Sequence, residues 1–280
     1  MINSLLLSLI VSGSPKLAPG LSKLDFQFAT ENRECVVTLP QAITSGKKLP
    51  LVILIHGFTG NARNIMGYSG FEKLAQREGF ILMAPEGYGK PQAWNCGFIN
   101  LGRAGVDDLG YFGELLKRAK SEYPVDPKRI YVCGHSNGAM MSAALGGKYS
   151  ETIAAIGAAS GLVASGRTKP TYVDVPKRPV SAIFVHGTAD NVVAYDPKDQ
   201  ALVAGISAPD AAKWWASKVG IKSPPVVTKL TNYSHTSYVG ARASVSFYSL
   251  TGWKHDWSNS AGPINTAEVM WKFFRANPKR

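Results

Sequence analysis

A serine with a glycine two positions to either side is the residue of this chain best placed for covalent chemistry. It is Ser136, in the run Gly134-His135-Ser136-Asn137-Gly138. The apolar residues 129–133 precede this run, and the small-residue stretch 139–145 follows it. A strand that turns sharply into a helix strains the backbone of its central residue, and only glycine at the flanking positions leaves room for that turn. The pattern therefore predicts an exposed serine hydroxyl between a strand and a helix.

A serine hydroxyl is a weak nucleophile near neutral pH, so it needs a histidine base and a carboxylate that orients the base. Asp190 closes the run 186–190 (HGTAD), directly after the apolar residues 180–185. His255 stands a few residues past the alternating run 243–248. Both lie at the carboxyl tip of a predicted strand, where open parallel sheets place their sites. The order serine, aspartate, histidine is also the one used by hydrolases with a G-x-S-x-G turn.

The other four histidines have simpler interpretations. His56 and His186 each precede a glycine at a predicted strand end, so we expect them to hydrogen-bond loop backbone. We expect His135 to pack beside the sheet, and His235 lies in a polar stretch without catalytic partners. His255 therefore remains as the predicted base.

Two other carboxylates compete with Asp190 for the acid position. Asp256 is the chief rival because it adjoins His255, but adjacent residues of an extended segment point apart. Asp196 is a weaker rival, one short loop further along the chain. We therefore assign the acid to Asp190.

The chain also offers an oxyanion hole. The apolar run 50–55 predicts a buried strand that leads into His56-Gly57-Phe58. A glycine there lets the backbone approach a substrate carbonyl, so that the amide N–H of Phe58 can act together with that of Asn137. This pair is the predicted binding site for the negative charge that develops on the carbonyl oxygen.

With these motifs in place, the chain resembles the esterase branch of the α/β-hydrolase superfamily, which includes polyhydroxybutyrate depolymerases, feruloyl esterases and acetyl xylan esterases. The resemblance runs from about residue 30 to the C-terminus. The matching stretches are His56-Gly57-Phe58, Trp94-Asn95, 106–112 (VDDLGYF), 125–131 (VDPKRIY), 136–141 (SNGAMM) and 186–190 (HGTAD).

The resemblance implies an α/β-hydrolase fold, with a mostly parallel, doubly wound sheet flanked by helices and no large lid domain. It also implies a serine ester hydrolase that works through an acyl-enzyme, without metal or organic cofactor. The chain departs from the family at Ala139, where a glycine is usual, and at Lys254 and Ser258 around the base. His255 and Trp257 keep their relative places, so the departures concern the wall of the pocket.

The arrangement of apolar runs agrees with an α/β domain. The run 34–39 predicts an opening antiparallel strand, and 80–84 and 153–157 predict parallel core strands. Helices are predicted over 108–120 and after the capping patterns at Ser207 and Asn265. We expect residues 21–280 to form one catalytic domain and 1–20 to be a signal or an apolar tail.

Aromatic residues flank the predicted catalytic loops and are expected to wall the acyl or alcohol side of a substrate. These predicted substrate-binding residues are Trp94, Phe98, Trp253 and Trp257. The segment 161–179, where a lid would be inserted, is too short for a helical cap. An open site favours ester groups that project from something large.

The ends and the rarer residues of the chain add further expectations. The apolar run 1–13 resembles the end of a secretory signal, so we expect a secreted or periplasmic protein, and the run is too short to span a bilayer. Cys35, Cys96 and Cys133 allow at most one disulfide, and none has metal-ligand spacing.

The net charge of +12 does not indicate nucleic acid, because the cations are scattered and not interleaved with aromatic residues. The expected partner is an ester substrate, with feruloyl or acetyl esters of plant polysaccharide first and short polyhydroxyalkanoate oligomers next. An acyltransferase and an inactive binding protein on the same scaffold are the alternatives from other classes. The sequence leaves the oligomeric state open.

Overall fold

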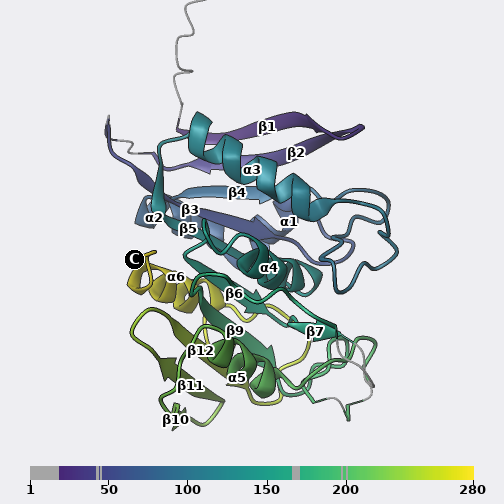
Figure 1. Ribbon diagram of the computed structural model, residues 1–280, viewed down its shortest axis with the longest axis vertical. Helices are drawn as coiled ribbons and strands as arrows, with labels where there is room; N and C mark the ends of the chain where they lie inside the picture. Colours follow the sequence, from purple (N-terminus) through teal and green to yellow (C-terminus); the bar gives the residue numbers. More distant parts are fainter. Residues whose placement is uncertain (1–18, 42–43, 45, 166–170, 197, 200) are drawn as a thin grey trace, which may run out of the picture.

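The computed structural model describes residues 19–41, 44, 46–165, 171–196, 198–199 and 201–280. Almost all of the expected signal or apolar tail lies outside these residues. The described part contains a ten-stranded sheet with the strand order β1-β2-β4-β3-β5-β6-β9-β12-β11-β10 (Figure 1). Within this part, no helix is both long and apolar enough to cross a membrane.

The centre of the sheet is parallel and its two margins are antiparallel. The parallel strands are β4 (Ile81–Pro85), β3 (Leu49–Ile55), β5 (Val125–His135), β6 (Ala155–Ala159), β9 (Ser181–Gly187) and β12 (Ser244–Leu250). The antiparallel strands are β1 (Gly20–Phe28), β2 (Glu31–Leu39), β11 (Tyr233–Val239) and β10 (Val226–Lys229). All seven residues of β3 and of β9 are buried, as strands covered on both faces require.

Helices cover both faces of this sheet. One face packs against α3 (Asp108–Glu122), α4 (Asn137–Lys148) and α5 (Ala208–Lys218), which lie one below the other in Figure 1. The other face packs against α1 (Ala62–Ser69), α2 (Phe71–Glu78) and α6 (Thr266–Ala276). Each face has its own hydrophobic core, so the sheet is doubly wound, as the sequence predicts.

The predicted helix starts are confirmed by their caps. The side chain of Ser207 accepts a hydrogen bond from the amide of Asp210 at the start of α5. The side chain of Asn265 accepts one from the amide of Glu268 at the start of α6. Such caps satisfy backbone N–H groups that have no partner within the helix, which is why these patterns mark helix starts in a sequence.

One expectation needs correction, and one segment has more structure than was predicted. The sheet opens with β1 and not with the predicted strand at 34–39, which is β2, because only Leu24 and Phe26 of β1 are buried and its apolar pattern is weak. The segment 161–179 contains a small antiparallel pair, β7 (Ala164–Ser165) with β8 (Thr171–Tyr172); residues 166–170 lie outside the described part. The described residues contain no large lid.

Candidate active site

Ser136 joins β5 to α4 in a strained conformation. Its φ of 55° and ψ of −120° are rarely adopted by a residue with a side chain. The flanking glycines make this turn possible: a Cβ on Gly138 would lie 2.1 Å from the carbonyl oxygen of Ile55, and one on Gly134 would lie 2.6 Å from it. The strain and the two close approaches confirm the strand-to-helix turn predicted from the sequence.

The structure brings the predicted nucleophile, base and acid together. The Nε2 atom of His255 lies 2.9 Å from the Oγ atom of Ser136, and its Nδ1 atom lies 2.8 Å from Oδ2 of Asp190. Asp190 and His255 follow β9 and β12, which are parallel neighbours in the sheet. Adjacent strand tips therefore place the two residues side by side. The rival Asp256 has an exposed side chain and lines the mouth of the cleft.

Asp190 is buried and fully engaged. Its Oδ1 atom accepts hydrogen bonds from the amides of Val192 and Val193, both at 2.9 Å. Its Oδ2 atom lies 3.3 Å from Nε2 of His186, in addition to the contact with His255. Burial opposes ionisation, but the hydrogen bonds of His186 and His255 outweigh it and hold the pKa of Asp190 below its usual range. The carboxylate therefore stays ionised beside the ring of His255.

His186 and His56 bond to loop backbone, as expected. Nε2 of His186 lies 3.0 Å from the carbonyl oxygen of Val193, and Nε2 of His56 accepts a hydrogen bond of 2.9 Å from the amide of Gly87. The contact of His186 with the acid is an addition that the sequence analysis did not foresee. His235 lies on β11 against Tyr248, away from these residues.

The backbone of the β3–α1 loop lies against the strained turn. A Cβ on Gly57 would lie 3.2 Å from Cβ of Ser136, so the chain passes close to the serine there. Phe58 follows Gly57, and Asn137 is the first residue of α4. The first N–H groups of a helix have no partner within that helix. Both predicted oxyanion-hole residues thus have their backbone next to Ser136.

Trp94 does not wall the cleft, contrary to expectation. Its side chain is completely buried beneath the site, packed against His56 and Phe112, so it is out of reach of a substrate. The Asn137 side chain accepts from the amide of Trp94 at 2.8 Å and donates to its carbonyl at 3.1 Å, and the indole N–H of Trp94 donates to the carbonyl of His56 at 2.9 Å. Trp94 therefore ties both predicted oxyanion-hole segments to one loop.

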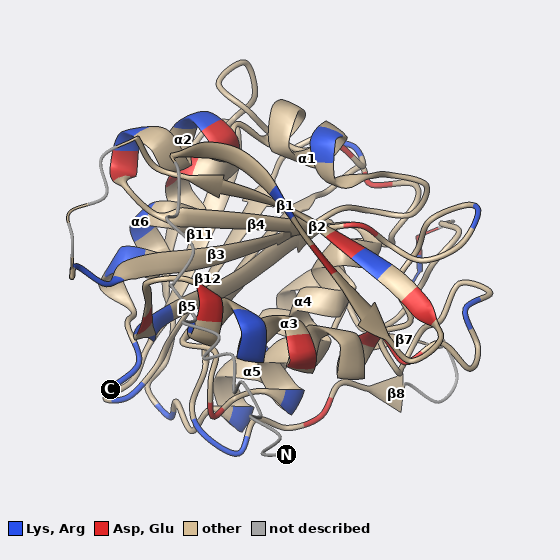
Figure 2. Ribbon diagram, turned by 90° about the horizontal axis from the view of Figure 1, so that it is seen from above, with Lys and Arg blue, Asp and Glu red and all other residues tan. Residues whose placement is uncertain are grey.

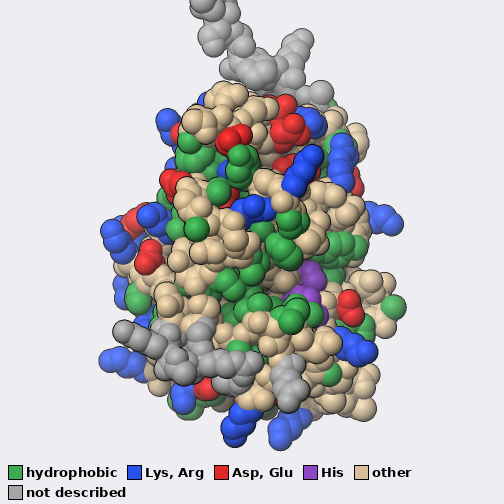
Figure 3. Space-filling view, turned by 90° about the vertical axis from the view of Figure 1, so that its right-hand side faces the viewer, with side chains coloured by type: hydrophobic (Ala, Val, Ile, Leu, Met, Phe, Trp, Pro, Cys, Tyr) green, Lys and Arg blue, Asp and Glu red, His purple; other side chains and the backbone are tan. Residues whose placement is uncertain are grey.

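A cleft of about 710 Å³ opens over Ser136 at the carboxyl edge of the sheet. Figure 3 shows the histidine side chains in a hollow bordered by hydrophobic side chains. The side chains that line it include Phe58, Tyr68, His135, Trp257, Asn64 and Asn259. Phe58 and Tyr68 are 45% and 44% exposed, so their rings are available to a substrate.

Of the four predicted substrate-binding residues, Trp257 alone is among the described residues that line this cleft. Phe98 is buried and faces a separate hollow that it shares with Cys96, Leu109 of α3 and Ala144 of α4, away from Ser136. Trp253 is half-buried, its indole N–H donates to the carbonyl of Asp256 at 2.9 Å, and its side chain is not part of the cleft lining.

His135 and Tyr68 are site residues that the sequence analysis missed. The ring of His135 stacks on that of His255 with centroids 5.2 Å apart, so it does not simply pack beside the sheet. The Tyr68 hydroxyl lies 3.3 Å from Nδ1 of His135. Burial lowers the pKa of His135 to about 3, so the ring is neutral next to the base. The position of His135 directly before the predicted nucleophile, between Gly134 and Ser136, was the feature of the sequence that could have indicated a place in the site.

The described residues show no group of three or more histidine, cysteine or acidic side chains arranged to hold a metal ion. All three cysteines are buried and unpaired. Cys133 lies in the core on β5, and Cys96 lines the separate hollow with Phe98.

Similarity to known proteins places the chain in a family. The sequence profile of the esterase PHB depolymerase family matches residues 35–179, just over half of the chain. Feruloyl esterase B of Piromyces equi is 32% identical over 205 residues, which cover 69% of this chain and 37% of that protein. A probable feruloyl esterase C of Aspergillus clavatus is 25% identical over 268 residues, covering 94% of this chain and 88% of the relative.

The fold is also that of solved esterase structures. An acetyl xylan esterase from Aspergillus awamori superposes with a TM-score of 0.67 at 20% identity, over 91% of this chain and 99% of that one. This chain spans little more than a third of the Piromyces equi protein, so the similarity to it concerns one part of a longer polypeptide. The chain belongs to the esterase PHB depolymerase family and has an α/β-hydrolase fold.

Proposed function

We propose that the protein is a serine carboxylic-ester hydrolase that acts through an acyl-enzyme on feruloyl or acetyl esters of plant polysaccharide. The observation that carries this proposal is the continuous chain of contacts from Ser136 Oγ through the His255 ring to Asp190, at 2.9 and 2.8 Å. A hydroxyl within hydrogen-bond reach of an oriented imidazole is the arrangement that nucleophilic catalysis requires.

The reaction has two halves. Ser136 Oγ attacks the ester carbonyl carbon while Nε2 of His255 takes the hydroxyl proton, and the backbone N–H groups of Phe58 and Asn137 hold the oxyanion. The intermediate then expels the alcohol, which receives the proton from His255. In the second half, water attacks the acyl carbonyl while His255 takes a proton from it. The bond to Ser136 Oγ then breaks, Ser136 regains its proton from His255, and the carboxylic acid is released.

The electrostatics support these roles. Asp190 keeps its negative charge because its pKa lies below the usual range, so it stabilises the imidazolium that forms on His255. Burial lowers the pKa of the adjacent His135 to about 3, so this ring is neutral near neutral pH. The His255 imidazolium therefore lies next to the carboxylate of Asp190 and stacks on an uncharged His135 ring.

The shape and lining of the cleft support the substrate class. It is open, and the exposed rings of Phe58 and Tyr68 are available to a bound group, whereas Trp257 lines the cleft with a ring that is only 6% exposed. Stacking of a planar acyl group on such a ring contributes about 1 kcal/mol, which a flexible hydroxybutyrate unit does not gain. The names of the relatives, feruloyl esterase and acetyl xylan esterase, agree with this choice. Because polysaccharide esters lie outside cells, we also infer that the protein is secreted.

A second candidate is the hydrolysis of short polyhydroxyalkanoate oligomers, which the name of the matching family favours. The two candidates separate in a panel of methyl ferulate, an aryl acetate and a hydroxybutyrate oligomer. We expect kcat/KM to be highest on the first. A higher kcat/KM on the hydroxybutyrate oligomer would make the second candidate function the preferred one. Transfer of the acyl group to added alcohol in preference to water would indicate an acyltransferase.

The nucleophile is tested by labelling with an organophosphonate. Ser136→Ala should remain folded, lose the label and lose several orders of magnitude in turnover, because such residues act as a unit. Ser142→Ala is the matched control, since Ser142 lies on the same helix with its hydroxyl bonded to the carbonyl of Gly138. The control should label like the parent protein. Retention of an active-site label in Ser136→Ala would refute the assignment.

A further inference from the structure

Cationic side chains gather at the edge of the sheet opposite to the cleft, where the parallel strands begin. We call this edge, defined by the starts of β3, β5, β9 and β12, the amino edge. Figure 2 shows lysine and arginine positions concentrated around the C-terminus, on this side of the molecule. Two cavities open there, one of about 290 Å³ and one of about 360 Å³.

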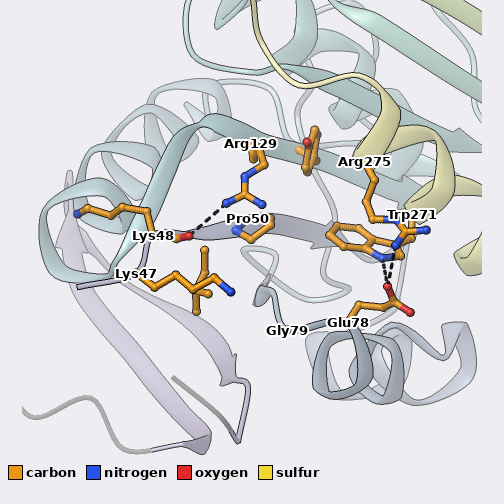
Figure 4. A pocket seen from close by; sticks show the side chains of 10 residues that line it. Lys47, Lys48, Pro50, Glu78, Gly79, Arg129, Trp271 and Arg275 are labelled. Atoms are coloured by element: carbon orange, nitrogen blue, oxygen red, sulfur yellow. Dashed lines mark hydrogen bonds and ion pairs between the residues drawn. The ribbon is translucent and has the colours of Figure 1, made fainter. Parts of the chain in front are cut away.

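The first cavity lies at the starts of β3 and β5 and is lined by Lys47, Lys48, Arg129 and Arg275 (Figure 4). A hydrogen bond of 3.1 Å from the guanidinium of Arg129 to the carbonyl of Lys48 ties the two strand starts together. Tyr131 also lines this cavity, and its buried hydroxyl has no hydrogen-bond partner among the described residues. This cavity is therefore both cationic and polar at its base.

One carboxylate lines this cavity, and it is already engaged. Glu78 accepts a hydrogen bond of 2.9 Å from the indole N–H of Trp271 and pairs with Arg275 at 3.3 Å, as the dashed lines of Figure 4 show. Lys47 and Lys48 form no ion pair with any residue that the structure describes. Figure 4 shows the Lys48 side chain directed away from the other lining residues, so of the two it is the Lys47 ammonium that faces the cavity without a carboxylate of its own.

The second cavity lies at the starts of β9 and β12 and has no acidic residue in its described lining, which includes Arg178, Arg242 and Lys279. Arg178 pairs with Glu151 at 2.8 Å, whereas Arg242 and Lys279 form no ion pair within the described chain. Burial, with the nearby charges of Arg178 and Lys120, lowers the pKa of Lys279. Glu151, outside the cavity lining, is the nearby acid that partly compensates these positive charges.

The two cavities together carry an excess of positive charge. Leaving the terminal Arg280 aside, seven cations line them: Lys47, Lys48, Arg129, Arg178, Arg242, Arg275 and Lys279. The described chain pairs three of these with acids, namely Arg129 with Asp126, Arg178 with Glu151 and Arg275 with Glu78. The remaining excess is four charges, a third of the net charge of +12.

We propose that the amino edge is a docking surface for a carboxylate-bearing polysaccharide, a polyuronate, which holds the enzyme on the polymer while the cleft remains free. This inference rests on the proposed function, in which the ester groups are attached to a polysaccharide. The cations extend from β3 to β12, four strand spacings of about 4.8 Å each, or about 19 Å. An extended polymer with repeating charges matches such a row better than a compact anion does.

The lining argues against two other polyanionic partners. Tyr131 and Trp271, its aromatic residues, are 0% and 3% exposed, so neither offers a ring face on which nucleic-acid bases could stack. No large apolar side chain in the described lining of either cavity is exposed, so neither cavity offers a side chain that could insert between lipids and strengthen the attraction to an anionic membrane. Charge complementarity to carboxylates is the property that remains.

The test is affinity electrophoresis in gels that contain polygalacturonate, with a fully methyl-esterified polymer as the uncharged reference. Lys47→Gln with Lys48→Gln, and separately Arg242→Gln with Lys279→Gln, should each weaken binding about fivefold, because an exposed ion pair contributes little individually. Lys73→Gln with Lys213→Gln is the matched control, since both lysines are exposed and lie outside the two cavities. It removes the same charge and should leave binding unchanged.

Hydrolysis of a soluble aryl acetate by all three double variants should match the parent enzyme, because none of these residues lines the cleft. Binding that is absent in the parent, equally weakened by the control pair, or equally strong to duplex DNA at the same salt would overturn the docking proposal. A parent enzyme that binds polygalacturonate but hydrolyses no ester would instead refute the proposed function, so the two failures are distinguishable.

Discussion

Replacing Asp190 by asparagine tests the electrostatic core of the proposed mechanism with almost no change of shape. The amide oxygen can take the place of Oδ1 and still accept from the amides of Val192 and Val193, so the loop after β9 stays in place. The amide nitrogen then occupies the place of Oδ2 and donates to Nδ1 of His255. This fixes the tautomer with the proton on Nε2, which cannot accept the proton of Ser136.

The expected loss in kcat is about 10⁴-fold, which corresponds to about 5.5 kcal/mol of barrier. The new amide N–H also faces His186 at the 3.3 Å contact, a mismatch that should lower the free energy of unfolding by about 1 kcal/mol. The measurements are turnover of an aryl acetate and urea unfolding of the same samples.

Asp256→Asn is the control, because this carboxylate lines the cleft mouth but His255 is bonded to Asp190. Its activity should stay within about twofold of the parent. A larger loss of activity for Asp256→Asn than for Asp190→Asn would refute the assignment of Asp190 as the acid that orients His255. Retention of a tenth or more of the activity by Asp190→Asn would refute it as well.

Three further predictions concern buried side chains in and beneath the site. Trp257→Ala should lower kcat/KM for methyl ferulate more than for an aryl acetate, because the ring lines the cleft; equal losses on both esters would remove it from the acyl side. Since this ring is only 6% exposed, the substitution should lower the free energy of unfolding as well. Trp94→Ala should cost about 3–5 kcal/mol of unfolding free energy, because its ring is fully buried. Burial lowers the pKa of His56 to about 4 and that of His135 to about 3. In the unfolded chain both histidines have a pKa near 6.5, so below this pH the unfolded chain binds more protons than the folded one. The free energy of unfolding should therefore fall as the pH drops from 6.5 to 4. Urea unfolding at several pH values checks this, and His135→Phe should flatten the dependence; an unchanged slope would contradict it.

The proximity of Ser136, His255 and Asp190 could be predicted because each residue follows a strand that is recognisable in the sequence. Buried parallel strands are continuous apolar runs, and their carboxyl tips share one edge of the sheet. Residues on adjacent tips must then be neighbours, whatever their separation along the chain. Their catalytic roles remain predictions that the proposed variants will test.

The walls of the cleft could not be predicted in the same way. Trp94 adjoins a family motif, but nearness to a motif does not say whether a side chain points outward or inward, and this one is held inward by bonds to Asn137 and His56. Tyr68 comes from α1, a helix of eight residues that carries no acidic residue in its first turn and no basic residue in its last. Its position opposite His135 depends on tertiary packing, which a local pattern does not record.

The amino edge can bind a polyanion while the cleft at the carboxyl edge hydrolyses an ester, because the charges at the two edges are far apart. Seven residues of β9 connect the amino edge to the loop of Asp190, about 20 Å at strand spacing. That distance is about twice the screening length at physiological ionic strength, so cations at the amino edge have little influence on the charge of His255 during the reaction. Selection for charge at one edge and for chemistry at the other can proceed independently. For the same reason, substitutions at Lys47 or Arg242 can change how the protein is held without changing what the cleft does.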